Sequence, residues 1–202
     1  MLQQSYKGEN KMKIIENGTV TSPKGYLGAG EHVGIKKAKK DLALIYSKVD
    51  AKAVGTFTQN IVKAAPVLWD MMIVDNYDLV RIIAVNSGVA NACTGDEGLK
   101  CNEEFAQTVA DNFGLEKEEV LICSTGVIGK QLPMNKIING VPIVKPLLSE
   151  SQEAGVIVAE SIMTTDTKPK HLAVEIEVGG KTVTLGACCK GSGMIHPNMA
   201  TM

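Results

Sequence analysis

The stretch from Lys190 to Met202, KGSGMIHPNMATM, brings a cation, two glycines and a threonine hydroxyl together within a few residues. A threonine hydroxyl becomes a strong nucleophile when a base lies within hydrogen-bond reach. The most compact base is the α-amino group of the same threonine after the preceding peptide bond is cut. Ala200–Thr201 is a candidate for that bond, because Ala200 is small and Gly191 and Gly193 permit a close backbone approach. Taken alone, the same residues also fit a Gly-Ser-Gly loop that leads into an apolar segment.

A second candidate for chemistry follows the apolar run Val120–Ser124, where the sequence continues Thr125-Gly126-Val127-Ile128-Gly129. Gly126 lets the backbone approach a reacting atom closely, and Thr125 adds a hydroxyl donor. A hydroxyl and a backbone N–H directed at one point form an oxyanion hole, which stabilises the negative charge that develops during acyl transfer. The alternative is an ordinary strand-to-helix turn.

Two further segments have side chains suited to a ligand. The strand-like run Arg81–Val85 leads into small and amide residues, Asn86-Ser87-Gly88-Val89-Ala90-Asn91-Ala92-Cys93-Thr94-Gly95, and such a loop presents backbone N–H groups beside a cleft. Further along, Thr164-Thr165-Asp166-Thr167 places hydroxyls beside a carboxylate, which suits an amino-acid substrate. The threonine-rich run also fits a turn that ends a helix.

Lys190 is expected at the end of a strand. The alternating run Leu172–Val178, the pair Gly179-Gly180 and the run Val183–Ala187 predict a β-hairpin with one solvent-exposed face. The second strand of this hairpin leads through Cys188-Cys189 into Lys190. At that place a cation can bind a substrate carboxylate or stabilise an oxyanion.

These motifs, in this order, resemble those of the ornithine acetyltransferases (glutamate N-acetyltransferases) of arginine biosynthesis, over nearly the whole chain from about Gly18 to Met202. One position departs from the family pattern: Val89 stands where an asparagine is usual, which questions a polar role for that side chain. The resemblance implies that Thr201 is the nucleophile and that Ala200–Thr201 is cut autocatalytically. It further implies an oxyanion hole of Thr125 and Gly126, with substrate contacts from Thr165, Lys190 and Thr201. Thr164 is the alternative to Thr165.

The resemblance also implies a two-step acetyl transfer. The threonine takes acetyl from N-acetylornithine and then gives it to glutamate, which predicts ping-pong kinetics. Some family members also use acetyl-CoA as the donor, and the sequence leaves this open. One alternative is an N-terminal-nucleophile aminopeptidase of related fold, which would pass the acyl group to water. Another is a non-catalytic small-molecule binding module.

The family resemblance predicts a partner chain. Cleavage leaves Ala200 as the last residue of this chain and makes Thr201 the first residue of a C-terminal β chain from the same precursor. The expected assembly is an α2β2 heterotetramer. We expect the β chain to supply the rest of the substrate pocket, so this chain alone should be inactive.

Composition excludes several other function classes. The chain has 202 residues, 45% hydrophobic content and a formal net charge of −1, which offers no electrostatic case for nucleic acid or an anionic membrane. No apolar run is long enough for a membrane helix, and the first residues do not form a secretory signal, so a cytoplasmic location is expected. Five cysteines and three histidines show no zinc spacing, so we expect no metal and no cofactor.

The elements that must position these motifs alternate between strand and helix. Residues 1–11 are polar and are expected to form a mobile extension, with residues 12–202 as the portion completed by the second chain. The alternation predicts the α/β class. The fold that the resemblance implies is a layered sandwich of β-sheets flanked by helices, of the autoprocessed N-terminal-threonine type. The pattern predicts strands near 19–22, 41–47, 53–58, 81–85, 120–124, 172–178 and 183–187, and helices beginning near 65 and covering 99–113, 132–140 and 149–163.

Overall fold

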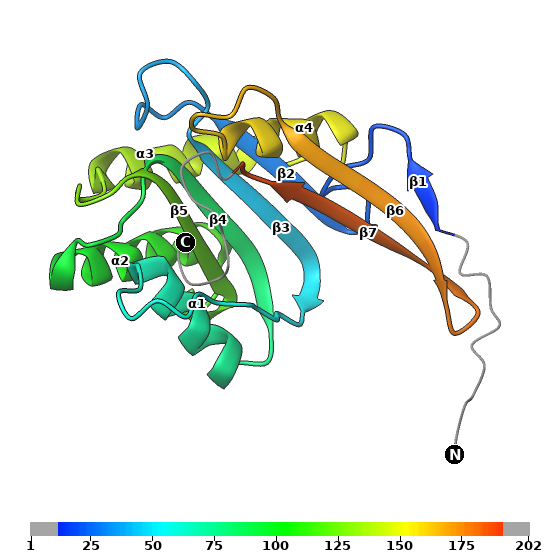
Figure 1. Ribbon diagram of the computed structural model, residues 1–202, viewed down its shortest axis with the longest axis horizontal. Coiled ribbons are helices and arrows are strands. Elements are labelled where there is room, and N and C mark those ends of the chain that lie inside the picture. Colours follow the sequence, from blue (N-terminus) through cyan, green and yellow to red (C-terminus); the bar gives the residue numbers. More distant parts are fainter. Residues whose placement is uncertain (1–11, 192–202) are drawn as a thin grey trace.

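The computed structural model describes residues 12–191, which form two β-sheets flanked by helices (Figure 1). The predicted α/β class is therefore confirmed, whereas the expected N-terminal extension lies outside the described residues. Two short 3₁₀ turns, at Lys117–Glu119 and Lys145–Leu147, complete the regular structure of this part of the chain. The other elements, in chain order, are β1 (Lys13–Ile15), β2 (Tyr26–Glu31), β3 (Leu42–Ala51), α1 (Ala65–Asn76), β4 (Val80–Val89), α2 (Gly95–Phe113), β5 (Val120–Val127), α3 (Met134–Val144), α4 (Gln152–Ser161), β6 (Lys170–Val178) and β7 (Lys181–Cys189).

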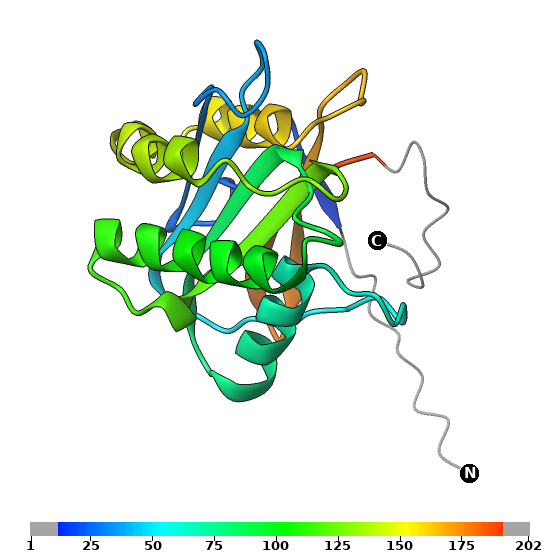
Figure 2. The same ribbon diagram turned by 90° about the vertical axis from the view of Figure 1, so that its left-hand side faces the viewer.

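The larger sheet has the strand order β2-β3-β4-β5 and carries α2 and α3 on one face. Figure 2 views this face, with the two helices lying across the strands. Alternate strand residues point to it, as Leu42 and Leu44 do in β3, because side chains of a strand alternate between its faces. The core on this side includes Leu42, Leu44, Ile82, Ala84, Phe105, Val109, Val120, Ile122, Ile137 and Val141, all at most 1% exposed.

Strands β4 and β5 are parallel and are joined by α2, so their carboxyl ends lie at the same edge of the sheet. The other neighbouring pairs in this sheet are antiparallel. Ligands of α/β sheets commonly bind just beyond the carboxyl ends of such strands. The Asn86–Gly95 and Thr125–Gly129 segments are both placed there.

The second face of the larger sheet packs against α4 and the end of the smaller sheet, which has the strand order β1-β6-β7. Val158 and Ile162 contact Ala43 and Val85 from the large sheet, with Cys188 beside them. The end of β7 is therefore brought to the larger sheet, although β7 itself is hydrogen-bonded only to β6 among the described strands.

The predicted hairpin is confirmed, with Gly179 and Gly180 at φ 58° and 75° in the turn. The exposed side, however, is not the one that the alternation suggests. Leu172 and Leu185 are 49% and 51% exposed, whereas Ala173 is 1% exposed because it packs against the turn at Gly18. The apolar face of β6 and β7 thus has no covering layer in the described part of the chain.

Helix predictions were mostly correct. The helix predicted over 99–113 is α2, which begins four residues earlier and ends at Gly114 with φ 66°, while α1 and α4 lie where the pattern indicated. Gly140 does not end α3, which continues to Val144. At Gly140 a Cβ atom would lie 2.8 Å from Val33 Cγ1, so this glycine serves close packing against the 32–41 loop.

Two strand predictions were wrong. The run 53–58 forms no strand because the β3–β4 ladder ends at Ala51, and Val54 is 93% exposed. The segment 19–22 is a turn in which Thr19 and Thr21 are buried and share a hydrogen bond, and the strand follows it as β2. No helix within residues 12–191 is long and apolar enough to cross a bilayer.

Candidate active site

Thr125 and Gly126 lie in the last part of β5, directly opposite β4. Ser87 pairs with Thr125, and Gly88 pairs with Gly126. Both strands therefore continue through segments that the sequence predicted as loops, because each provides the other's hydrogen-bonding partner. Gly126 has φ 137°, and a Cβ atom there would lie only 2.2 Å from the Gly88 carbonyl carbon. Only glycine fits this position, and its backbone is left exposed at the surface.

A buried asparagine holds the two strand ends together. The Ser124 hydroxyl donates to Asn86 Oδ1 at 2.6 Å, and Asn86 Nδ2 donates to the Val89 carbonyl at 2.8 Å. Asn86 is fully buried, so its bond to the Val89 carbonyl is shielded from water, and the bond from Ser124 is part-buried. Val89, the departure from the family pattern, places its side chain in the hydrophobic core and is 2% exposed. It contributes through its carbonyl oxygen and has no polar side-chain role.

The turn after α4 is organised by Asp166. One carboxylate oxygen accepts the Gly191 N–H at 2.5 Å and the Lys170 ammonium at 2.8 Å, and the other accepts the Thr164 N–H at 3.3 Å. Burial raises the pKa of Asp166, but these three hydrogen bonds outweigh it and lower the pKa to about 2. Asp166 therefore remains ionised, with both oxygens engaged within the protein. Its carboxylate ties this turn to the end of β7 and is not free to bind a substrate ammonium.

Thr164 and Thr165 lie in this turn and differ in exposure. Thr164 is half-buried, whereas the predicted contact residue Thr165 is exposed. Lys190 follows β7 directly, as predicted, and its ammonium donates to the Gly191 carbonyl at 3.0 Å. Both threonines thus stay candidates for the substrate contact. The hydrogen bond between Asp166 and Gly191 brings their turn next to Lys190.

Lys36 lies next to the candidate site residues, a position that the sequence did not reveal. A basic run such as Lys36, Lys37, Lys39 and Lys40 is typical of a solvated face, and this holds for the exposed Lys37 and Lys39. The side-chain stem of Lys36 instead packs against Gly88, since a Cβ atom built on that glycine would lie 3.0 Å from Lys36 Cγ. The ammonium of Lys36 donates to the Met163 carbonyl at 3.0 Å. Burial lowers the pKa of Lys36, against the attraction of Asp41.

The loop that carries Lys36 is folded around Asp41. This aspartate is fully buried and accepts the backbone N–H groups of Val33 and Lys36, each at 2.7 Å. His32 Nδ1 lies 3.1 Å from Asp41 Oδ2. The aspartate therefore fixes the path of the loop over the end of β4, and nothing in the basic run itself distinguishes Lys36 from its neighbours.

These contacts connect the segments that sequence analysis selected. Gly126 touches Gly88 across the sheet, Gly88 touches Lys36, and Lys36 is bonded to Met163 at the start of the threonine turn. Asp166 in that turn is bonded to Gly191, next to Lys190. Thr125 and Gly126, the threonine turn and Lys190 are thus brought to one end of the larger sheet. Ala200 and Thr201 lie outside the described residues, and Gly191 is the last residue before them that the structure describes.

The edge strand β5 is held in place by two side chains of α1. Trp69 Nε1 donates to the Val120 carbonyl at 2.9 Å, and the Ile122 N–H donates to Asp70 Oδ1 at 2.9 Å. These bonds replace those of a neighbouring strand along the first half of β5. Burial raises the pKa of the Asp70 carboxyl to about 7, against a smaller opposing effect of the Ile122 N–H.

Asp70→Asn is expected to stabilise the protein at pH 8 and to have little effect near pH 4. An acid whose pKa rises on folding contributes stability that is fully present below its ordinary pKa of 3.8 and lost as the pH rises to about 7. The asparagine amide oxygen can still accept the Ile122 N–H without a charge. We expect a gain on the order of 1–3 kcal/mol at pH 8, measured by thermal unfolding at several pH values. Asp75→Asn, an exposed site on the same helix, is the control; an equal gain at both pH values would contradict the assignment.

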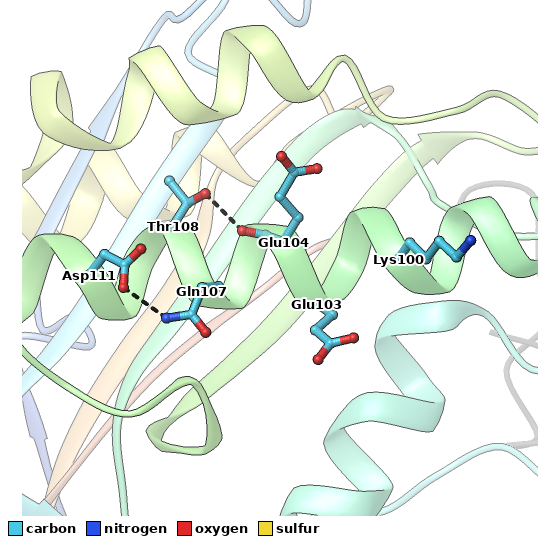
Figure 3. A pocket seen from close by; sticks show the side chains of 6 residues that line it. All are labelled: Lys100, Glu103, Glu104, Gln107, Thr108 and Asp111. Atoms are coloured by element: carbon cyan, nitrogen blue, oxygen red, sulfur yellow. Dashed lines mark hydrogen bonds between the residues drawn. The ribbon is translucent and has the colours of Figure 1, made fainter.

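A shallow depression along α2 is unrelated to this site (Figure 3). It is formed by polar side chains on the solvent side of one helix, and it contains none of the predicted site residues. Its lining consists of Lys100, Glu103, Glu104, Gln107, Thr108 and Asp111. Within residues 12–191, no group of three or more His, Cys, Asp or Glu side chains is placed to hold a metal ion.

Comparison with known proteins identifies relatives of this chain. Two proteins named arginine biosynthesis bifunctional protein ArgJ, from Caldanaerobacter subterraneus and Lactococcus lactis, are each 48% identical to this chain over 191 residues. The match covers 95% of this chain in both cases, but 46% and 47% of the relatives. The chain thus spans about half the length of the curated relatives it matches.

Two solved structures share the fold. The ArgJ protein of Bacillus halodurans is 40% identical with a TM-score of 0.90, and the match covers 95% of this chain and 99% of that chain. The ornithine acetyltransferase of Mycobacterium tuberculosis, solved in complex with ornithine, is 38% identical with a TM-score of 0.87, covering 93% and 98%. The profile of the ArgJ family matches residues 28–202. The chain therefore belongs to the ArgJ family.

Proposed function

We propose that this chain, together with a C-terminal β chain from the same precursor, forms a cytoplasmic acyltransferase that moves acetyl from N-acetylornithine to glutamate. The chain would arise by autocatalytic cleavage between Ala200 and Thr201. Members of the family named as bifunctional, and a solved relative bound to ornithine, support the substrate class. Use of acetyl-CoA as a second donor remains an open extension of the same chemistry.

One observation carries this proposal: the chain of contacts that connects Thr125–Gly126 to Lys190. A hydroxyl, an exposed glycine backbone and a lysine at one end of a sheet provide the donors that an acyl-transfer intermediate requires. Thr201 follows Lys190 by eleven residues in the sequence. That length of chain can return a nucleophile to the same end of the sheet, since an extended residue spans about 3.3 Å or more.

In the first half-reaction, Thr201 Oγ attacks the acetyl carbonyl carbon of N-acetylornithine, and its proton passes to the α-amino group of Thr201. The carbonyl oxygen becomes negative and is stabilised by donors from Thr125 and Gly126. When the intermediate collapses, the carbon–nitrogen bond breaks and the ornithine nitrogen takes the proton. Acetyl is left as an ester on Thr201.

In the second half-reaction, the neutral amine of glutamate attacks the ester carbon. The amine loses a proton to the Thr201 α-amino group, and the ester oxygen takes that proton back as it leaves. N-acetylglutamate and free Thr201 result. Because ornithine departs before glutamate reacts, the two substrates can use one site in turn.

The exposed apolar face of the hairpin supports the proposed partner chain. Ile14 pairs with Val174 in β1 and β6, and Ile14, Leu172 and Leu185 are each 49–62% exposed. A contiguous apolar face of this kind marks a surface that another protein covers. Since the curated relatives are about twice as long as this chain, their C-terminal half is the natural occupant. We propose that the two chains pair and that two such pairs form the α2β2 assembly.

The test uses this chain extended by the C-terminal half found in its relatives. Steady-state rates at several fixed glutamate concentrations should give parallel double-reciprocal lines, as a ping-pong mechanism requires. Incubation with N-acetylornithine alone should add one acetyl group to the Thr201 peptide, measured by mass spectrometry. Free acetate formed at the same rate with and without glutamate would reject the transferase in favour of an aminopeptidase-like hydrolase.

A further inference from the structure

We propose that Lys36 binds the α-carboxylate shared by the donor and acceptor amino acids, so that it is a substrate-binding residue of the ArgJ site. This inference rests on the proposed function and adds a binding residue to it. It depends on three features of the described structure: the place of Lys36 beside Gly88, the lack of a carboxylate partner for its ammonium, and its hydrogen bond to Met163.

The stem of Lys36 lies beside the strand ends that hold the oxyanion-hole pair. A Cβ atom on Gly88 would be 3.0 Å from Lys36 Cγ and 3.1 Å from Ile35 Cγ2, so the loop is packed tightly over this glycine. Gly88 pairs directly with Gly126. A side chain at Gly88 would push the lysine stem away from the strand ends, and its absence lets the stem pack against them while the ammonium lies at Met163, next to the threonine turn.

The Lys36 ammonium has no anionic partner within residues 12–191. No Asp or Glu oxygen of the described chain lies within 4.0 Å of its Nζ. Asp41, whose charge attracts Lys36, uses its two oxygens for backbone N–H groups and His32. Lys36 Nζ has three N–H donors, and the structure shows one bond, to the Met163 carbonyl. A half-buried cation with unused N–H donors favours an anionic ligand. Burial lowers the pKa of Lys36, as expected for a cation that has lost part of its water.

The position of Lys36 favours the α-carboxylate over the other anionic groups of the substrates. N-acetylornithine and glutamate differ at their side-chain ends, but both have an α-carboxylate one carbon from the nitrogen that gives or receives acetyl. A group that serves both half-reactions must bind what the two substrates share. Since the acetyl carbon must sit at Thr125 and Gly126, the α-carboxylate falls within a few ångströms of them. The Lys36 stem lies beside Gly88 and its ammonium beside Met163, between the Thr125–Gly126 pair and the threonine turn.

The matched variants are Lys36→Met, which keeps the apolar stem without the charge, and Lys36→Arg, which keeps the charge. Lys37→Met and Lys39→Met are controls, because they remove the same charge from exposed positions of the same loop. All are made in the extended chain after complete self-cleavage. The substrates are N-acetylornithine and N-acetylputrescine, which is the same molecule without its α-carboxylate.

Lys36→Met should lower kcat/KM for N-acetylornithine by about tenfold or more, mainly through KM, because it removes a charged partner from a partly desolvated pair. The kcat/KM for N-acetylputrescine should be low in the wild type and unchanged by this substitution. Lys36→Arg should recover part of the loss, and the two control variants should match the wild type. Equal losses for both donors, or no loss for either, would overturn the assignment.

A binding measurement separates this inference from the proposed function. Calorimetry with ornithine and putrescine needs no turnover, so it reports on Lys36 even if acetyl transfer to glutamate is not observed. Lys36→Met should weaken ornithine binding by about tenfold or more while putrescine binding stays the same. Unchanged ornithine affinity would reject the role of Lys36, whatever the outcome of the transfer assay.

Discussion

Thr201→Ala is expected to leave a single uncut chain without acetyl-transfer activity when the chain carries the C-terminal half of its relatives. In the proposed mechanism, Thr201 contributes the hydroxyl next to the scissile bond and, after cleavage, both the nucleophile and the base. Loss of a catalytic nucleophile costs about 10⁴-fold or more in kcat. Gel mobility and intact mass report the cleavage, and acetylglutamate formation reports the activity.

Two variants make the Thr201 result specific. Thr201→Ser keeps a hydroxyl and an α-amino group at the same position, so it should still be cut and retain measurable turnover. Ser192→Ala removes another hydroxyl from the same segment and should be cut like the wild type. Efficient cleavage of Thr201→Ala at the same bond would reject the nucleophile assignment and direct attention to Ser192.

Local sequence patterns predicted the helices and strands that have a regular hydrophobic pattern of their own. In α2, Phe105, Ala106, Val109 and Ala110 are fully buried, as their three- and four-residue spacing indicated, and the helix ends at Gly114. The hairpin of β6 and β7 was predicted from alternation and a glycine pair, and it places Lys190 after its second strand. Motifs located on such elements could be placed from the sequence alone.

The ends of β4 and β5 could not be predicted in the same way. Asn86, Gly88 and Gly126 are of residue types that are depleted in strands. They are nevertheless extended, because each segment pairs with the other across a parallel ladder. Strand formation here depends on a partner about forty residues away in the sequence, as β-structure commonly does. Thr125 and Gly126 are thus held in a strand and do not form a turn.

Lys36 shows a second limit of sequence analysis. It differs from Lys37 through contacts with Gly88 and Met163, which come from distant parts of the chain. A basic run is usually solvated, but the side chain of Lys36 packs against the end of β4. The buried Asp41 distinguishes Lys36 from its neighbours, because it accepts hydrogen bonds from the Val33 and Lys36 N–H groups and so fixes the path of the loop. The sequence pattern does not reveal these hydrogen bonds.

Thr125→Ala is expected to lower kcat by roughly a hundredfold or more while KM for N-acetylornithine changes little. The Ser124 hydroxyl is already bonded to Asn86, whereas no such bond engages the Thr125 hydroxyl within residues 12–191. That hydroxyl is therefore free to donate to the oxygen that becomes negative in the intermediate. Removal of one oxyanion-hole donor costs about 3 kcal/mol in the transition state and little in the ground state.

The Thr125 measurement requires processed enzyme, because the same hydroxyl could assist the self-cleavage that creates the nucleophile. Variants should be purified after cleavage is complete, and active sites should be counted by acetylation of Thr201 before rates are compared. Thr125→Ser retains the donor and should keep kcat within about tenfold of the wild type, whereas Thr125→Val keeps the shape of the side chain and should lose as much as alanine. A raised KM at unchanged kcat would instead make Thr125 an ordinary substrate contact. The negative charge would then have to be stabilised by backbone N–H groups around Gly126, where the close approach to Gly88 leaves no room for any side chain.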